Sequence, residues 1–217
     1  MNMNAEKYLR YLQNEIHSIV FATVDENGDP ATCVIDMMLA DENGLYFLTA
    51  KGKTFYARLK AHDMISITGF HGEDTMSSKS VTVRGRVREL GGELLPKIFK
   101  ANLYMAEIYP DEKSRAALTV FQVYEGEGEF FDLSAKPIFR ESFSFGGAAK
   151  KVSGYFVTDK CIGCKLCYSV CPQKCIDITA KAVIIEQEHC LHCGRCAEIC
   201  PAKAIEKRES HDTAGTN

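Results

Sequence analysis

The chain has 217 residues, of which 46% are hydrophobic and 25% charged, and its formal net charge is −3. This is the composition of a folded globular protein, and the length allows one ordinary domain plus a small one. No basic stripe indicates nucleic-acid binding, and no run approaches the ~18–20 apolar residues that a membrane span requires. Residues 1–10 lack an apolar signal core, so we expect no leader peptide.

Hydrophobic periodicity predicts an α+β domain over residues 1–145 that is dominated by antiparallel strands. Helical spacing covers residues 6–16, 54–61 and 93–106. The predicted strands are 18–24, 31–39, 45–49, 64–70, 80–88, 119–124 and 129–133. Turn residues at 25–30 and 41–44 join the first three strands by short connections. Strands joined in this way close most economically into a barrel, because closure removes exposed edges.

One turn of this domain combines residues that bind anions. The strand at 45–49 runs into Ala50-Lys51-Gly52-Lys53-Thr54, and a helix follows. Backbone N–H groups at a helix N-terminus favour a phosphate, and the two lysines would neutralise its charge. A solvated turn has a similar composition, so both interpretations stay open at this point. The P-loop pattern G-x4-G-K-[ST] is absent, which excludes that class of nucleotide site.

The stretch 146–154 is rich in Gly, Ala and Ser and has no periodicity, which predicts a linker between two domains. Residues 155–208 form the second predicted domain. The polar residues 209–217 are predicted to be a disordered tail.

Eight of the ten cysteines follow one spacing twice. Each copy reads C-x2-C-x2-C-x3-C-P, in which three thiolates hold one corner of a cuboidal iron–sulfur cluster. In two-cluster ferredoxins the fourth ligand of each cluster comes from the other copy. The sequence therefore predicts one [4Fe–4S] cluster (cluster I) on Cys161, Cys164, Cys167 and Cys200, and a second (cluster II) on Cys190, Cys193, Cys196 and Cys171.

Structural zinc and a disulfide framework are the two alternatives for these cysteines. Zinc uses four ligands, usually as two separated pairs, and needs neither a third cysteine two residues on nor a Cys-Pro. Disulfide frameworks are typical of small secreted domains. Iron–sulfur clusters and free thiols together indicate the reducing cytoplasm as the location.

The two cysteine copies align without a gap over residues 161–176 and 190–205. This duplication predicts a pseudo-twofold fold, and residues 155–208 resemble a bacterial-type two-cluster ferredoxin. The extra cysteine, Cys175, aligns with Ala204, which favours core packing over cluster ligation. His192 aligns with Gly163 in a cluster loop, and we expect its side chain to face solvent rather than bind iron.

The first domain resembles the pyridoxamine 5′-phosphate oxidase-like family of FMN-binding split barrels. The resemblance rests on a strand–hairpin–strand pattern ending DENGLYFLTA, on the basic turn and helix TAKGKTFYARLKAHD, and on the later strand VTVRGRV. It implies an α+β fold with an antiparallel split β-barrel, followed here by the small two-cluster ferredoxin domain. It also implies an FMN bound in a cleft at a homodimer interface.

The resemblance assigns flavin contacts by position. The phosphate and ribityl chain would be held by Thr49, Lys51, Lys53 and Thr54. The ring edge would contact Val34, Ile35 and Asp36, largely through their backbone. Two further residues, Ser80 and Thr82, fall where family members place polar flavin contacts. A surface-facing strand position is the alternative for Asp36. Arg84 and Arg86 fit either a phosphate contact or solvated strand charges.

Two departures from the family pattern argue against pyridoxal phosphate synthesis. Cys33 stands where true pyridoxamine-phosphate oxidases have an arginine, and their substrate-binding Arg-x-His element is not evident. We expect Cys33 to pack in the core, and a thiol near the flavin is the alternative.

Together these features predict a flavin–iron–sulfur oxidoreductase that passes electrons between the two clusters and FMN, with a redox partner protein or a small molecule as acceptor. No acid–base residue stands out, so neither catalytic residues nor a substrate are assigned. One alternative is a pure electron carrier without its own substrate. Another is a barrel that binds a deazaflavin, or haem through His17, His62 or His71. A redox sensor is the third.

Overall fold

The described chain, residues 3–212 of a computed structural model, divides into two compact units. Unit 1 contains the chain up to His71 together with Ser80–Glu129 and Phe143–Ala148. Unit 2 contains Gly72–Lys79, Phe130–Ser142 and the chain from Ala149 onward. The segments 72–79 and 130–142 therefore group with the second unit, although the sequence analysis places both in the first domain.

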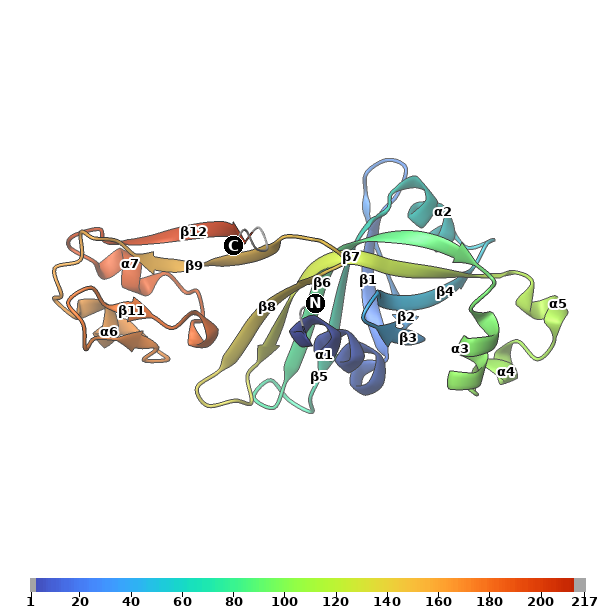
Figure 1. Cartoon of the computed structure of the whole chain (residues 1–217), viewed down its shortest axis with the longest axis horizontal. Coiled ribbons are helices and arrows are strands. Elements are labelled where there is room, and N and C mark those ends of the chain that lie inside the picture. Colours follow the sequence, from blue (N-terminus) through green and yellow to red (C-terminus); the bar gives the residue numbers. More distant parts are fainter. Residues whose placement is uncertain (1–2, 213–217) are drawn as a thin grey trace. The chain divides into compact units, whose positions relative to one another are not determined.

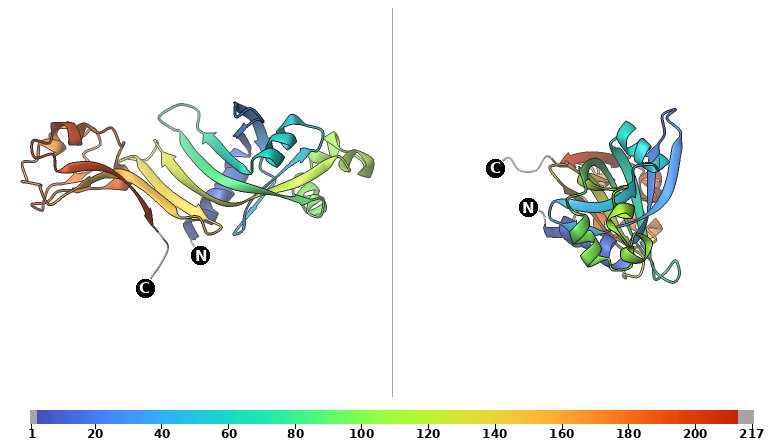
Figure 2. Two further views of the ribbon diagram at one scale, coloured as in Figure 1. Left: turned by 90° about the horizontal axis from the view of Figure 1, so that it is seen from above. Right: turned by 90° about the vertical axis from the view of Figure 1, so that its right-hand side faces the viewer.

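Unit 1 is built around a mainly antiparallel sheet of eight strands (Figure 1), in which residues 79, 130–132 and 139–142 are grouped with unit 2. They are β1 (Ser18–Val24), β2 (Pro30–Asp36), β3 (Leu39–Asp41), β4 (Gly44–Ala50), β5 (Met64–His71), β6 (Lys79–Gly91), β7 (Leu118–Asp132) and β8 (Phe139–Phe145). The order is β2-β1-β5-β6-β7-β4-β3, and β8 pairs with β7. The pairs β1–β2, β1–β5, β3–β4 and β4–β7 are antiparallel. Figure 2 shows the strands of this unit curling around a common interior.

Helices precede the first of these strands and occupy two of the connections between them. Helix α1 (Met3–Tyr11) continues as the π-helix η1 (Leu12–Ile16) before β1, and α2 (Thr54–Ala61) joins β4 to β5. Three short helices lie between β6 and β7: α3 (Leu95–Ala101), α4 (Met105–Ile108) and α5 (Glu112–Arg115). Among the described residues, no helix is both long and apolar enough to cross a membrane.

Aromatic side chains fill the interior of unit 1. The ring of Phe47 lies 4.8 Å from that of Phe21 and 5.7 Å from that of Phe121, and all three side chains are fully buried. Phe55 of α2 joins them with its ring 6.0 Å from that of Phe47. Along β6, buried and exposed residues alternate over positions 81–88, which is the pattern of a strand with one face in the core. The strands and α2 therefore share one core.

The α+β class and several predicted elements are confirmed. The predicted strand 18–24 and helix 54–61 are β1 and α2 with the same bounds. The predicted strand 31–39 is instead the two strands β2 and β3, because the chain changes hydrogen-bond partner between them. The N–H of Met37 donates to His17 O beside β1, whereas the N–H of Met38 donates to Tyr46 O in β4, each at 2.8 Å.

Two other predicted elements differ from the structure. The single helix expected at 93–106 is interrupted after α3 at Asn102, whose side-chain amide donates to the carbonyl oxygens of Ile98 and Met38. The two strands expected at 119–124 and 129–133 form one continuous strand, β7. Its partners come from distant parts of the chain, so local periodicity understates its length.

Unit 2 is built on two small antiparallel sheets and two short helices. The longer sheet pairs β9 (Lys150–Val157) with β12 (Ile205–Asp212), and the shorter pairs β10 (Ile176–Asp177) with β11 (Ile184–Ile185). The helices are α6 (Leu166–Val170) and α7 (Arg195–Ile199), with the 3-10 turn η2 (Gln187–His189) before the second cysteine copy.

The sheet β9–β12 corrects two sequence predictions. The predicted linker 146–154 is wrong for its second half, because β9 begins at Lys150. The predicted disordered tail 209–217 is wrong at its start, because β12 continues to Asp212, which pairs with Lys150. The rest of that tail lies outside the described residues. Each strand finds its partner about fifty residues away, so neither stretch shows a local strand signal.

The predicted duplication of unit 2 appears in its backbone. Six residues with positive φ form three pairs that align in the duplicated sequence: Gly163 and His192, Lys165 and Gly194, and Lys174 and Lys203. Because left-handed conformations are uncommon outside glycine, their repetition at equivalent positions shows that both halves adopt the same loop geometry.

Candidate functional site

Two cavities in unit 2 are lined by cysteines from both copies of the motif. The first is lined by Cys161, Cys164, Cys167 and Cys200, with apolar neighbours that include Val183 and Ile205. The second is lined by Cys171, Cys190, Cys193 and Cys196, with apolar neighbours that include Ile176 and Ile185. In each cavity three motif cysteines come from one copy and the fourth from the other, which is the grouping predicted for clusters I and II; Cys175, outside the motif, also lines the second cavity.

The short helices explain how the cysteines reach these cavities. The third cysteine of each copy, Cys167 or Cys196, is the second residue of α6 or α7 and is buried. The residue that precedes each helix, Lys165 or Gly194, has a left-handed φ that turns the loop back on itself. The two helices contact each other, which brings both copies together.

Backbone amides already approach the sulfurs. The N–H of His192 donates to Cys190 Sγ, and the N–H of Ala204 to Cys200 Sγ, each at 3.3 Å. Such hydrogen bonds help to set the reduction potential of an iron–sulfur cluster. Within residues 3–212, no three His, Cys, Asp or Glu side chains lie close enough together to bind a single metal ion. The eight motif cysteines are instead spaced around the two cavities. These residues fit two [4Fe–4S] clusters, and ligation itself stays a prediction.

Cys175 is packed beside the ligands predicted for cluster II. It is 2% exposed, as expected for core packing, and its Sγ lies 3.6 Å from Cys171 Sγ. A hydrogen bond to Cys190 and burial raise the pKa of the Cys175 thiol. The equivalent residue beside cluster I is Ala204, so the two cluster sites differ in this thiol.

His192 does not face solvent, and that prediction is wrong. Burial, followed by the positive charge of Arg140, lowers the pKa of His192 to about 4. Arg140 Nη1 donates to Nδ1 of the neutral ring at 2.5 Å, and the nearby His189 Nδ1 lies 2.8 Å from the carbonyl oxygen of Ile138. The segment 130–142 therefore contacts the cluster II loop, and no local pattern in the sequence signals these contacts.

The basic turn of unit 1 joins β4 to α2 and presents two exposed lysines. The N–H of Lys51 donates to Ala117 O and that of Lys53 to Ala50 O, each at 3.0 Å, so the turn backbone is held in place. Thr54 begins α2, and no side chain caps the amide groups of this helix. Within the described residues neither lysine forms an ion pair, so both charges are available to an anion.

Arg58 adds a third positive charge that the sequence analysis missed. Its Nε donates to Thr23 Oγ1 at 2.8 Å, and its Nη1 lies 3.5 Å from Thr54 Oγ1. It stands one helical turn after Thr54, and this i, i+4 spacing is the signal that could have identified it.

Cys33 is half-buried rather than packed in the core, which corrects the sequence prediction. Burial raises the pKa of the Cys33 thiol, against the opposing effects of Arg58 and Lys53. The thiol therefore lies near the basic turn. It is accessible because β2 ends the strand order of the sheet. Since β2 also contacts β4, the structure brings β2 and the basic turn together.

Thr49 is the most enclosed of the predicted phosphate contacts. It is 2% exposed, and its Oγ1 is buried without a hydrogen-bond partner within the described residues. An unpaired buried hydroxyl costs about 1–3 kcal/mol, so a partner that reached it would be stabilising. Because this oxygen is buried, a ligand at the surface does not contact it in this conformation.

The predicted ring contacts Val34, Ile35 and Asp36 lie together at the end of β2, where Val34 is 63% exposed. Asp36 accepts hydrogen bonds from Ser18 Oγ at 2.6 Å and from the Tyr104 hydroxyl at 2.8 Å. Burial raises the pKa of Asp36, but these hydrogen bonds outweigh it and hold that pKa below its usual range. Because the carboxylate is already engaged, the β2 backbone and Val34 are what remain for a flavin.

Ser80 and Thr82 lie apart from the other predicted flavin contacts within one chain. Both are on β6, which β1 and β5 separate from β2 in the sheet order. Three strand spacings correspond to about 14 Å along the sheet. Arg84 is an exposed strand residue, and Arg86 forms an ion pair with Asp63 at 2.8 Å, so Arg86 is better described as a strand charge than as a phosphate ligand.

The three histidines considered for haem differ in their surroundings. His17 Nε2 lies 3.0 Å from the Tyr104 hydroxyl, and His71 Nδ1 lies 3.2 Å from the Tyr11 hydroxyl. His62 is exposed and directly follows α2. Two of the three rings are therefore already engaged in hydrogen bonds.

Two family models match the chain. Residues 5–129 match the model described as pyridoxamine 5′-phosphate oxidase, and residues 160–204 match that of a 4Fe-4S dicluster domain. No curated protein gives a significant match.

Several solved structures share the fold of the first unit. A NimC/NimA family protein from Clostridium acetobutylicum is 17% identical with a TM-score of 0.55, over 65% of this chain and 93% of that one. A heme binding protein from Mycobacterium smegmatis is 17% identical with a TM-score of 0.50, over 66% of this chain and 59% of that one. ChuZ from Campylobacter jejuni is 14% identical with a TM-score of 0.50, over 64% of this chain and 59% of that one.

The two model matches agree with the two units. Unit 1 is a split barrel and unit 2 a small iron–sulfur domain of the two-cluster type, and this combination indicates a role in electron transfer. The pyridoxamine 5′-phosphate oxidase model covers more than half of the sequence, and the chain belongs to that family.

Proposed function

We propose that the protein is a flavin–iron–sulfur oxidoreductase that passes electrons between two [4Fe–4S] clusters in unit 2 and an FMN held by unit 1. The observation that carries this proposal is the grouping of the eight motif cysteines, four around each of two cavities. FMN is supported by the basic turn, where Lys51, Lys53 and Arg58 gather near β2 without an ion pair within the described residues.

The cofactors supply the redox chemistry, because FMN exchanges one or two electrons and each cluster exchanges one. The residues of the chain bind and orient them. Lys51, Lys53 and Arg58 would neutralise the flavin phosphate, and the uncapped amides at the start of α2 would donate hydrogen bonds to it. The backbone of β2 at Val34 would lie along the ring edge.

We further propose that the barrel forms a homodimer. On the outer face of β2 and β1, Val20 pairs with Val34 in register, and both side chains are largely exposed. Phe70 on the neighbouring strand β5 is exposed as well. A second copy of the chain would cover these apolar side chains. Ser80 and Thr82, which lie apart from β2 in one chain, would then contact a flavin only from the other copy.

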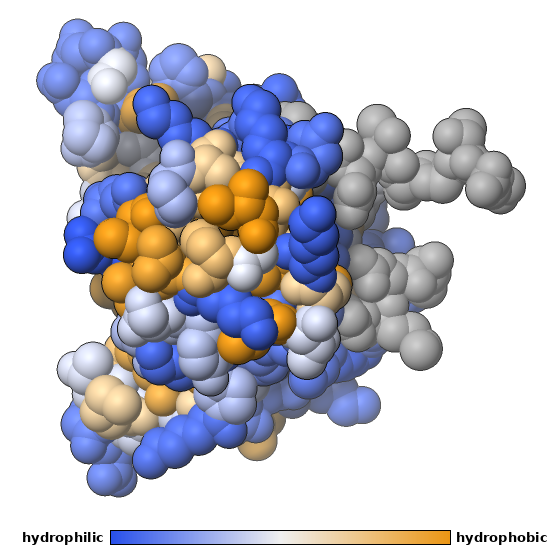
Figure 3. All heavy atoms as spheres, turned by 90° about the vertical axis from the view of Figure 1, so that its left-hand side faces the viewer, coloured by the Kyte–Doolittle hydropathy of each residue, from blue (hydrophilic) through white to orange (hydrophobic). Residues whose placement is uncertain are grey.

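A redox partner protein would find an apolar surface on unit 2. Ile162 and Leu191 follow the first cysteine of each copy and are exposed, as are Leu166 and Ile199 in α6 and α7. Figure 3 shows hydrophobic side chains gathered in the middle of one face, with hydrophilic ones around them. Apolar contacts close to both clusters suit short-lived docking of an electron donor or acceptor.

The proposal is tested by anaerobic purification of the full chain, followed by release and identification of its cofactors. We expect about eight iron atoms per chain, as two [4Fe–4S] clusters require, and FMN at close to one per chain. Removing two charge-assisted contacts with Lys51→Ala and Lys53→Ala together should weaken FMN binding by about tenfold to a hundredfold.

The matched control replaces two exposed lysines of α3, Lys97 and Lys100, by alanine. Both double variants lose the same charge, so only a local phosphate contact distinguishes them. Equal FMN affinity in the two double variants would remove the phosphate assignment. Turnover of small electron acceptors without any added protein would separate an oxidoreductase from a pure carrier.

Haem is the second candidate for the barrel, favoured by the fold it shares with the heme binding protein from Mycobacterium smegmatis. His62 would be the axial ligand to test first, because its ring is exposed and makes no hydrogen bond within the described residues. A Soret band in the purified protein that is lost in His62→Ala would establish this candidate and displace FMN.

A further inference from the structure

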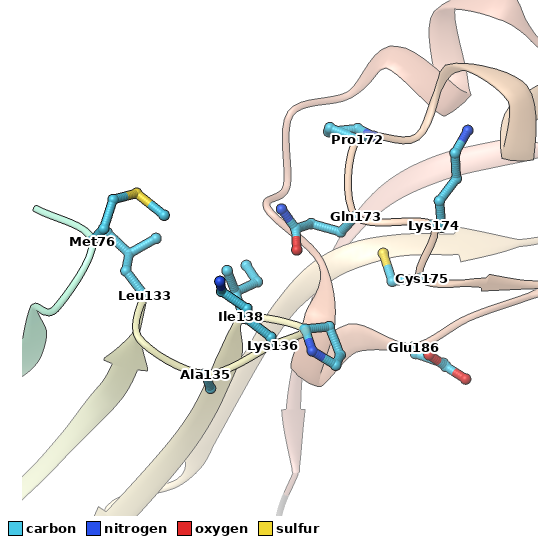
Figure 4. Close-up of a pocket in the computed structure, with 11 residues that line it drawn as sticks. Met76, Leu133, Ala135, Lys136, Ile138, Pro172, Gln173, Lys174, Cys175 and Glu186 are labelled. Atoms are coloured by element: carbon cyan, nitrogen blue, oxygen red, sulfur yellow. The ribbon is translucent and has the colours of Figure 1, made fainter.

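A groove of about 490 Å³ lies within unit 2 and adjoins the cavity predicted for cluster II, with which it shares Pro172, Gln173 and Cys175. One wall is formed by the segments 72–79 and 130–142, through Met76, Leu133 and Ile138. The facing wall is the loop that follows Cys171, residues 172–175, together with Glu186. In Figure 4 the side chains of Met76, Ile138 and Gln173 extend toward the space between the two walls.

The two walls are joined by specific contacts rather than by loose proximity. Ile138 is 6% exposed, and its carbonyl oxygen lies 2.8 Å from His189 Nδ1. Two residues on, Arg140 donates to the half-buried ring of His192. Both histidines flank Cys190, so the wall made by residues 130–142 is attached to the cluster II loop.

The floor of the groove is next to cluster II. Cys175 lines the groove, and its Sγ lies 3.6 Å from that of Cys171, a predicted ligand of this cluster. Pro172, adjacent to the same ligand, lines it as well. A molecule in the groove would therefore be separated from cluster II by little more than one side chain.

The lining defines the chemistry of a ligand. Leu133, Pro137 and Ile138 offer an apolar surface, and the volume is in the range of small-molecule sites. Lys136 adds an exposed positive charge on the same side. The ammonium of Lys174 is turned away, because it donates to the carbonyl oxygens of Tyr168 and Ser169 at 3.0 Å. Glu186 also lines the groove, but in Figure 4 its carboxylate is turned away from Lys136. The groove thus suits an apolar molecule that carries one anionic group at the Lys136 side.

We propose that this groove binds a redox-active aromatic anion of the quinone class and exchanges electrons with cluster II. In the reducing direction, the two clusters would supply one electron each, and the quinone would take up these two electrons with two protons from water to form the hydroquinone. Both clusters would then be oxidised, so atoms and electrons balance. The site rests on the clusters of the proposed function but requires no FMN.

The probe is an anthraquinone that carries a single sulfonate, added to the holoprotein in the absence of oxygen. Calorimetry with the oxidised protein measures binding, and stopped-flow absorbance after reduction measures the return of cluster colour. We expect saturable binding and a reoxidation rate that reaches a plateau. Reversing one partly solvated charge contact, in Lys136→Glu, should weaken binding by about fivefold.

Two further variants locate the site. Gln173→Trp fills the groove and should weaken binding of both the sulfonated and the uncharged anthraquinone, whereas Lys136→Glu should affect only the sulfonated one. Lys203→Glu is the matched control, because Lys203 aligns with Lys174 in the other half, is exposed and does not line the groove. It changes the net charge as much as Lys136→Glu, and we expect unchanged binding.

Iron content is measured for each variant so that loss of a cluster is not taken for loss of the site. A reoxidation rate that rises linearly with the probe, or binding equally weakened in Lys136→Glu and Lys203→Glu, would overturn the proposal. A protein without FMN that still binds the probe in this pattern would contradict the proposed flavin function and leave the groove site standing.

Discussion

The two units of this protein carry their chemistry in different ways. In unit 2 the predicted cluster ligands all lie between Cys161 and Cys200, and all eight come from two copies of one short motif. In unit 1 the candidate flavin site combines the backbone of β2, the turn after β4 and Arg58 of α2. A cluster site whose ligands have a fixed spacing can be identified directly from the sequence. The residues of a site that is formed by separate strands can be identified only once the fold is known.

The largest expected effect tests the crossed ligation of unit 2. Cys200→Ser should cost one whole cluster, reducing iron from about eight to about four atoms per chain. Cys200 is the better choice than Cys171, because Cys175 lies beside Cys171 and could replace it. Iron and sulfide analysis of anaerobically purified protein measures the loss.

Double variants distinguish crossed from uncrossed ligation. Cys161→Ser with Cys200→Ser should lose no more iron than either single variant, because both residues are assigned to cluster I. Cys196→Ser with Cys200→Ser should lose both clusters. The opposite pattern would mean that each copy of the motif holds its own cluster. Cys33→Ser, at a cysteine outside unit 2, serves as the control with full iron content.

The features that can be predicted from the sequence differ between the two units in the same way. The two cluster ligand sets could be listed from spacing alone, and the structure groups the same cysteines around two cavities. β1 and α2 could be predicted to the residue because their apolar patterns are local. β9 and β12 could not, since each is paired with a strand about fifty residues away and β12 is polar apart from Ile205.

Side-chain surroundings were harder to predict than elements. Cys33 was expected in the core, but it lies on β2, at one end of the strand order, and is near Arg58 and Lys53. His192 was expected in solvent, yet Arg140 comes from a segment fifty residues earlier and covers it. In both positions the side chain that sets the surroundings, Arg58 or Arg140, is distant in the sequence. Local hydrophobic patterns do not reveal such contacts.

The next prediction tests whether the stability of unit 1 comes from packing of its aromatic core, whereas that of unit 2 comes from its metal clusters. Phe47→Ala removes the ring at the centre of the aromatic core and should lower the free energy of unfolding by about 3–5 kcal/mol. Urea unfolding followed by circular dichroism measures it, and iron content under native conditions should stay at the wild-type value. Leu103→Ala, at an exposed apolar residue outside the proposed dimer surface, should cost less than about 0.5 kcal/mol. Equal losses in the two variants would contradict the assignment of Phe47 to the core.

A smaller effect tests the residue that the sequence analysis missed. Arg58→Gln keeps a hydrogen-bond donor near Thr23 but removes the charge, and it should weaken FMN binding by about tenfold. Arg84→Gln removes the same charge from an exposed position on β6 and should leave FMN affinity unchanged. Fluorescence titration of the flavin-free protein measures both. If Arg84→Gln had the larger effect, the phosphate would be bound at β6 and the site would have to be rebuilt there.

The smallest effect concerns the hydrogen bonds that hold Asp36 at the end of β2. Burial and the hydrogen bond to Asp36 raise the pKa of Tyr104. A group with a raised folded-state pKa stabilises the protein fully below its unfolded pKa, about 10 for tyrosine, and loses that contribution as the pH rises through the folded value. Tyr104→Phe should therefore cost about 0.5–1 kcal/mol at pH 8, and the difference from wild type should narrow above about pH 10.

Urea unfolding at a series of pH values measures this difference, and the other tyrosines cancel because both proteins contain them. Tyr109→Phe is the control, since its hydroxyl makes no hydrogen bond within residues 3–212. A constant difference across the pH range would mean that Tyr104 contributes only packing. In that case Ser18 and the nearby His17 would be the remaining partners of Asp36.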